Sequence, residues 1–309
     1  MALSRTRRPL QLQLARSRRA FFSTQKNPPP PTIFDGWSGI SAFATRVRDR
    51  LELFERYEAA GVFPPSMSSP ARYLLFARLQ LPTQTTVDAV EFLGGAQHAV
   101  DLALHTMFSQ EVANFAFGEI EASPATETLQ RIMSPMCFDM FFQGLKGMKG
   151  SMRTMEMKAL DIKAVHLAGA TWEKLSLADV KQQEREDLLA THDLIKARLL
   201  LTRPPPSGDN EDAPLTLHQP SLSELKGLYD VDSIVIEDAD HETFVERLRL
   251  DVVTETTENV TTSTVEDGER SVTRDTTAMW RFESLVTRPE DVDWRILTFM
   301  ERASTMHET

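Results

Sequence analysis

The sequence predicts an α+β fold in which N-terminal helices precede a curved, mostly antiparallel sheet. Up to about residue 148 the apolar residues recur every three or four positions, which is the helical period, and beyond it they tend to alternate with a period of two. Two runs rich in β-branched residues flank the sequence Glu-Asp-Gly-Glu at 266–269, as in a β-hairpin. Helices followed by strands, without regular alternation, are typical of α+β proteins.

The first predicted helix spans residues 38–61 and is amphipathic. Its apolar stripe consists of Ile40, Phe43, Val47, Leu51, Phe54 and Tyr57. Cationic residues, Arg46, Arg48 and Arg50, lie in its first half. This pattern suits an interfacial or partner-binding helix, but it equally suits a helix packed on the protein's own core. The candidate partner- or membrane-docking residues are Phe43, Arg46, Val47, Arg50 and Leu51.

Further helices are predicted at 70–81, 85–107, 126–133 and 135–148. The pair Gly94-Gly95 lies inside the second of these, where each glycine costs about 1 kcal/mol relative to alanine. That cost predicts a close helix contact at this point.

The strands are predicted at 155–165, 244–253, 260–265, 272–286 and 294–300, with 231–237 as a further candidate. We expect Trp280 and Trp294 to be buried on neighbouring strands, and Phe282 to pack on the helix that carries Phe92. The positions expected to face inward are apolar: Phe244 or Val245, Leu248, Leu250, Trp280, Phe282 and Ile296. An enzyme that used this interior would instead place convergent polar groups there.

The N-terminal segment, residues 1–26, has seven basic residues, no acidic residue, and hydroxyl and apolar residues interspersed. This composition predicts a cleaved mitochondrial targeting peptide; the alternative is a basic tail that binds nucleic acid or lipid. The predicted organisation is a targeting peptide (1–26), a linker and helical extension (27–84), an α+β domain (85–302) with an insertion (168–226), and a tail (303–309). Within the insertion, residues 203–214 have the composition of a flexible linker.

The charge balance limits the classes of partner. The chain has 34 basic and 45 acidic residues, so removal of the seven cations of 1–26 leaves 27 against 45, a net charge near −18. Direct nucleic-acid binding through phosphate neutralisation is therefore not expected. Cys137 is the only cysteine, which excludes an intramolecular disulfide and a cysteine-based metal site. No run approaches the ~18 apolar residues of a membrane span.

Catalytic motifs are absent from the sequence. It contains no phosphate-binding loop, dinucleotide fingerprint, nucleophile elbow or HExxH. His98, Asp101 and His105 share one helix face, but a solvated polar stripe explains them better than a metal site. Cys137 has apolar neighbours and is expected to be a buried, inert thiol. No catalytic residue, cofactor or metal is predicted.

Two segments resemble a known family. They are the helix Phe92–Val100 (FLGGAQHAV) and the ending that runs from Thr277 (TAMWRFE) to Asp293-Trp294 and the apolar strand after it. Both resemble the domain shared by translocase-of-inner-membrane subunit 44 and its relatives, over roughly residues 85–300. The resemblance implies a cone-shaped α+β domain like nuclear transport factor 2 and supplies no catalytic residues. The insertion at 168–226 and the Thr-rich hairpin at 254–277 depart from the family pattern.

Among these relatives, the chain looks most similar to the family of matrix AAA peptidase interacting protein 1. That similarity implies a soluble matrix adaptor or chaperone-like protein, peripheral to the inner membrane, which helps to sort imported proteins. The implied partners are an inner-membrane protease or the mitoribosome, and imported precursor proteins. One alternative is a structural protein of the mitoribosomal large subunit or of a respiratory complex. The other is a small enzyme that uses the cavity of the cone.

Overall fold

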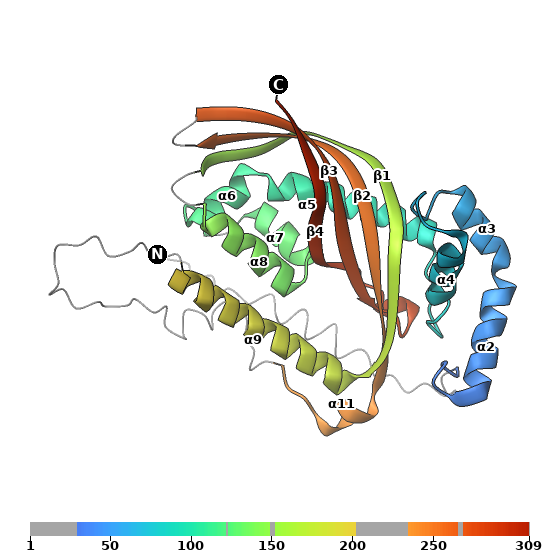
Figure 1. The fold of residues 1–309 in the computed structure, drawn as a ribbon. Coiled ribbons are helices and arrows are strands. Elements are labelled where there is room, and N and C mark those ends of the chain that lie inside the picture. Colours follow the sequence, from blue (N-terminus) through green and yellow to red (C-terminus); the bar gives the residue numbers. More distant parts are fainter. Residues whose placement is uncertain (1–29, 122, 149–151, 202–233, 265–267, 309) are drawn as a thin grey trace, which may run out of the picture.

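The computed structural model describes residues 30–121, 123–148, 152–201, 234–264 and 268–308 (Figure 1). The predicted targeting peptide (1–26) and the predicted linker (203–214) lie outside the described residues.

The described part of the chain forms one open antiparallel sheet with helices before it, which confirms the α+β prediction. The strands lie in chain order: β1 (Met152–Ser176), β2 (Phe244–Thr264), β3 (Gly268–Leu285) and β4 (Arg295–Glu308). β1 and β4 are therefore the two edges. Figure 1 shows the sheet curving around a group of helices.

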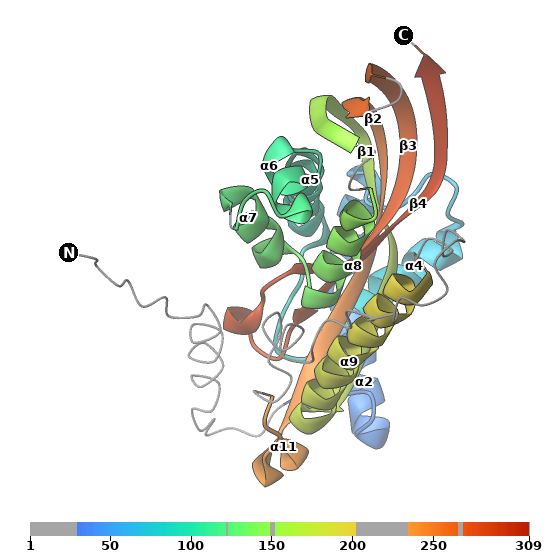
Figure 2. The same cartoon turned by 90° about the vertical axis from the view of Figure 1, so that its left-hand side faces the viewer.

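The helices fall into three groups. The first, beside β1, contains α2 (Gly36–Asp49), α3 (Leu51–Ala59) and α4 (Ser69–Leu79). The second, inside the curve of the sheet, contains α5 (Ala89–Met107), α6 (Gln110–Phe117), α7 (Pro124–Ile132) and α8 (Pro135–Lys146) (Figures 1 and 2). The third, between β1 and β2 in the chain, contains α9 (Leu177–Leu201) and α11 (Asp238–Glu242); the short 3-10 helix η2 (Pro289–Asp291) precedes β4.

The core lies between the sheet and α5. Trp280 is 2% exposed, and its indole Nε1 donates to Thr254 Oγ1 at 3.0 Å. The ring of Phe92 on α5 meets the ring of Phe282 edge to face, with 5.6 Å between centroids. The predicted burial of Trp280 and the packing of Phe282 on this helix are thus confirmed. Trp294 is only half-buried and lies just before β4, with its ring 4.7 Å from that of Phe92.

The strands are longer than predicted. The two predicted strands 244–253 and 260–265 form a single β2, because the polar residues between them have partners on the buried face. Glu258 is 2% exposed and pairs with Arg274 of β3 at 2.7 Å, and Thr256 donates to Glu258 at 2.9 Å. An alternation of apolar and polar residues cannot identify a buried face that consists of paired polar groups.

Both ends of the sheet correct predicted boundaries. β1 continues to Ser176, which pairs with Phe244, so residues 168–176 belong to the sheet and not to an insertion. β4 continues to Glu308, so the predicted tail is strand up to that residue. Residues 234–237 are irregular, so the described part of the candidate strand 231–237 is not a strand. The predicted hairpin at the Asp-Gly sequence is confirmed, and Gly268 has the positive φ of +72° that favours glycine.

The helix predictions need three corrections. The helix predicted at 38–61 is two helices, α2 and α3, separated at Arg50. The close contact predicted at Gly94-Gly95 is wrong, because no atom lies within 4 Å of a Cβ built on either glycine. Helix α6 was not predicted; Ser109 caps it by accepting from the Val112 amide at 3.4 Å, and Gly118 follows it with a φ of +78°.

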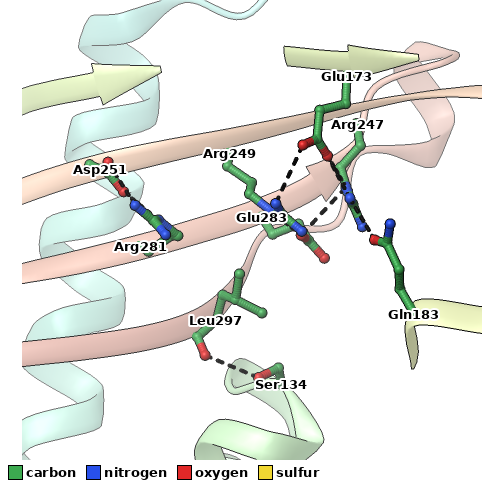
Figure 3. Close-up of polar contacts among 9 residues, drawn as sticks. All are labelled: Ser134, Glu173, Gln183, Arg247, Arg249, Asp251, Arg281, Glu283 and Leu297. Carbon is green, nitrogen blue, oxygen red and sulfur yellow. Dashed lines mark hydrogen bonds and ion pairs between the residues drawn. The ribbon is translucent and has the colours of Figure 1, made fainter. Parts of the chain in front are cut away.

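The face of the sheet opposite α5 carries ion pairs instead of apolar residues (Figure 3). Arg247 is 5% exposed and donates to Glu173 on β1 at 3.0 Å and to Gln183 on α9 at 2.8 Å. Beside it, Arg249 donates to Glu283 at 2.7 Å. These residues alternate along β2 with buried leucines, so the sheet has an apolar face toward α5 and a charged face that α9 partly covers.

Candidate functional site

Arg46 in α2 and Arg50, which follows α2, both contact the segment between α4 and α5. The Arg46 guanidinium donates through Nε to the Gln80 carbonyl at 3.1 Å. The Arg50 guanidinium donates to Gln80 Oε1 at 2.7 Å and to Thr86 Oγ1 at 3.0 Å. Gln80 is 1% exposed, so these contacts fix both arginines to the segment between α4 and α5. The backbone of Arg50 leaves the helical conformation, with φ −114° and ψ 17°.

A shallow groove lies between helices α2 and α3 on one side and helix α4 on the other. Its volume is about 320 Å³ and its lining is mainly apolar. The residues that line it are Phe43, Ala44, Val47, Arg48, Leu51, Tyr73 and Ala77. Three of the five predicted docking residues, Phe43, Val47 and Leu51, therefore lie together in one groove.

The floor of the groove belongs to the core. Val47 is buried, and Phe43 packs against the buried residues as a half-buried ring. Below them, the Phe54 ring contacts the rings of Tyr73 and Phe76, at centroid distances of 5.6 Å and 5.3 Å. The later part of the predicted apolar stripe is thus core.

Two residues of the predicted apolar stripe remain exposed. Ile40 and Leu51 are 47% and 42% exposed, and Tyr73 on α4 is 44% exposed. Trp37, one turn before Ile40 on α2, is 82% exposed, and Leu74 lies beside Tyr73 on α4 and is also exposed. Sequence reasoning missed Trp37 and the α4 residues; the signal available for α4 was the spacing of Tyr73, Leu74 and Ala77, which puts all three on one side of that helix.

Arg46 and Arg50 lie apart from the other three predicted docking residues. Both guanidiniums face the α4–α5 segment, so they do not extend the apolar groove as a cationic surface. Burial lowers the pKa of Arg46, and the negative charge of Glu246 opposes that effect. The third cation of the predicted helix, Arg48, lies in α2 and lines the groove. It pairs with Asp49 at 3.1 Å, and both side chains are mostly exposed.

A second hollow, of about 440 Å³, lies at the end of the sheet where β1 and β2 meet the α4–α5 segment. Its buried carboxylate is Glu246, which accepts from the Thr83 amide at 2.8 Å, from the Thr83 hydroxyl, and from Trp172 Nε1 at 3.4 Å. Lys174 lies over the ring of Phe244, 5.5 Å from its centroid. The carboxylate therefore already holds the α4–α5 segment against the sheet.

The other candidate groups of the sequence lie apart from the groove. Burial raises the pKa of the Cys137 thiol to about 12, so this thiol is protonated at neutral pH. His105 lies 3.4 Å from Asp101 on the exposed side of α5, and both side chains are nearly half exposed. Within the described residues, no three His, Cys, Asp or Glu side chains are grouped so as to hold a metal ion.

The predicted inward positions of the sheet are apolar and mostly buried. Leu248, Leu250 and Ile296 are fully buried on the face toward α5, whereas Phe244 at the start of β2 is 58% exposed. Among the described helices, none has the length and apolar character needed to cross a membrane.

Comparison with protein-family models, with curated proteins and with solved structures found no match to this chain.

Proposed function

We propose that this protein is a non-enzymatic mitochondrial matrix adaptor that holds partner proteins at the inner membrane. One observation carries the proposal: the apolar groove between α2, α3 and α4, whose lining residues Leu51 and Tyr73 are exposed. An apolar groove between helices that is rimmed by polar residues is a common mode of protein–protein docking.

The electrostatics favour a protein partner over a lipid surface. The chain has a net charge of −11. Loss of the cationic segment 1–26 would make the mature protein more acidic, and anionic lipid would repel it. The arginines that the sequence offered for lipid contact, Arg46 and Arg50, donate to Gln80 instead. We therefore propose that the contact with the inner membrane is indirect, through a membrane-bound protease or through the mitoribosome, and that imported precursor proteins are the clients.

The fold supports the same proposal at a coarser level. A curved sheet that encloses α5 with apolar side chains suits the cone-shaped domain of the translocase-of-inner-membrane subunit 44 family. We propose that this chain is a divergent member of that family. A structural subunit of the mitoribosome or of a respiratory complex would use the same groove, but its partner would cover the groove permanently.

The proposal is tested by site-specific photo-crosslinking in intact mitochondria. A photoreactive residue at Leu51 should crosslink to a protease subunit, a ribosomal protein or an imported precursor. The control places the same group at Met140 on α8, which is 52% exposed and apolar but lies outside the groove. Equal crosslinking patterns from both positions, or none from Leu51, would contradict the proposal. A single crosslinked partner in constant proportion would favour the structural-subunit alternative.

A further inference from the structure

The groove has the dimensions of a site for a helix. The residues of α2 and α3 that line it run from Phe43 to Leu51. At 1.5 Å per residue this distance is about 12 Å, or roughly two helical turns. The apolar residues Phe43, Val47 and Leu51, at four-residue spacing and opposed by Tyr73 and Ala77 of α4, match the contacts of an amphipathic helix laid in a groove.

Arg48 is the charged residue that lines the groove, and two carboxylates lie on α3 just beyond Leu51. Glu52 and Glu55 follow Leu51 on α3, and both are exposed. In the described part of the chain neither has a hydrogen-bond or ion-pair partner, whereas Arg48 and Asp49 neutralise one another. A helix with cations beside its apolar face would therefore find complementary charge at this rim.

From these two features we infer that the groove binds a cationic amphipathic helix of a partner protein. The inference rests on the proposed function and specifies the class of its ligand. The apolar face of the partner helix contacts Leu51, Tyr73 and Ala77, and its arginines or lysines lie over Glu52 and Glu55. An anionic lipid surface does not satisfy the same rim, because like charges would face one another.

The test is fluorescence anisotropy of two labelled peptides with the full chain. Both peptides are about 18 residues long with leucines at three- and four-residue spacing; one carries arginines and the other glutamates on the polar face. The arginine peptide should bind at least tenfold more tightly, and more so at low salt, because the exposed charges at the rim are screened at high ionic strength.

Three variants identify the surface. Glu52→Gln/Glu55→Gln should weaken binding of the arginine peptide roughly three- to tenfold, as expected for two exposed ion pairs. Leu51→Glu should weaken binding of the same peptide more than about thirtyfold, because it places a charge in the apolar contact. Met140→Glu, on α8, is the matched control and should leave binding unchanged. The glutamine variant changes only exposed side chains, so it remains informative if Leu51→Glu impairs folding.

Equal affinity for the two peptides, or no effect of Glu52→Gln/Glu55→Gln, would overturn the inference. The inference would also be overturned if vesicles of phosphatidylcholine and phosphatidylglycerol displaced the arginine peptide and if Leu51→Glu abolished vesicle binding. The occupant of the groove would then be lipid. Failure of this inference is distinguishable from failure of the proposed function. Partner crosslinks from Leu51 in mitochondria would persist if only the cationic character of the ligand were wrong.

Discussion

Glycine residues in α2 and α5 differ in the space around them. In α2, a Cβ on Gly39 would lie 1.8 Å from the carbonyl oxygen of Thr32. The turn from Thr32 to Asp35 is itself fixed, because the Asp35 carboxylate accepts from the Thr32 amide and hydroxyl at 2.6 Å and 2.8 Å. In α5, by contrast, Gly94 and Gly95 face open space. The first glycine permits a close approach of two backbones, and the other two lie at exposed positions of an ordinary helix.

Alanine substitution should therefore have opposite effects at these sites. Gly94→Ala and Gly95→Ala should each raise the free energy of unfolding by about 1 kcal/mol, because alanine favours the helix. Gly39→Ala should lower it, since the turn must move away from α2. Urea denaturation of the three variants measures the difference. A loss of stability at Gly94 or Gly95 would reveal a contact that the described residues do not make.

Tyr57 joins α3 to the start of α5 through its hydroxyl. This side chain is fully buried; its Oη accepts from the Ala89 amide at 2.9 Å and faces the Val87 carbonyl at 3.5 Å. Burial raises the pKa of the Tyr57 phenol, so the hydroxyl stays protonated at neutral pH. The Ala89 amide is at the first turn of α5, where no helical carbonyl is available to it.

Tyr57→Phe should lower the free energy of unfolding by about 1–3 kcal/mol, because it leaves a buried amide without a partner. The matched control is Tyr73→Phe, at a tyrosine that is nearly half exposed, which should change stability little. Chemical denaturation followed by tryptophan fluorescence compares the two. Equal effects would contradict the role assigned to the Tyr57 hydroxyl.

At the scale of elements, α9 makes polar contacts with the sheet and with α11. Gln183 accepts from Arg247 of β2 at 2.8 Å, and Lys181 pairs with Asp240 of α11 at 2.5 Å. The Asp187 carboxyl has a raised pKa, mainly through burial and then through the nearby negative charge of Glu283. A carboxyl whose pKa is higher in the folded than in the unfolded state stabilises the folded state only at low pH, and this contribution is lost as pH rises through the raised pKa.

Asp187→Asn should therefore raise the melting temperature at pH 7, where the native carboxylate is ionised near Glu283. The gain should vanish below the ordinary carboxyl pKa of 3.8, where Asp187 is protonated in both states. Melting curves of the variant and the wild type at pH 7 and at about pH 3.5 measure the difference. A stabilisation that is independent of pH would show that burial of the charge is not its cause.

The sequence predicted the elements whose buried face is apolar. The helix with Phe92 and the strand with Trp280 were placed correctly, because apolar periodicity reports burial directly. Apolar periodicity failed where a buried polar group has a polar partner, as with Glu258 in β2 and with Gln80, which accepts from Arg50. It also grouped Phe43, Val47 and Leu51 on one helix face, but the opposing wall of the groove, Tyr73 and Ala77, depends on tertiary packing that periodicity does not report.

At the scale of the whole molecule, the groove helices and the sheet share one hydrophobic core. Buried residues of α2, α3 and α4 belong to the same cluster as those of α5 and the strands. The Leu167 amide of β1 donates to the Val62 carbonyl, which follows α3, at 2.7 Å. The helices that were predicted as an extension at 27–84 therefore pack into the same core as the sheet, and the groove rests on that core.

Targeting should be separable from folding at this scale. Because residues 1–26 carry the predicted import signal, their deletion should leave the protein in the cytosol with an unchanged melting temperature. Fractionation of cells that express the truncated and the full chain measures the distribution, and the full chain is the control. Normal mitochondrial accumulation of a chain that begins at Asn27 would contradict the prediction.

The pairing of β1 with β2 has a consequence for how the chain folds. Ser176 and Phe244 lie opposite one another at the end of the ladder, although residues 177–243 separate them in sequence. Closing such a loop delays the pairing of the edge strand β1 with β2, so folding should be slow compared with the β2–β3 hairpin alone. The entropy of closure, however, grows by only about 0.6 kcal/mol for each doubling of the loop. Outside the contacts of α9 and α11, the intervening segment can thus change in length over evolution at little thermodynamic cost, while the groove and the sheet stay the same.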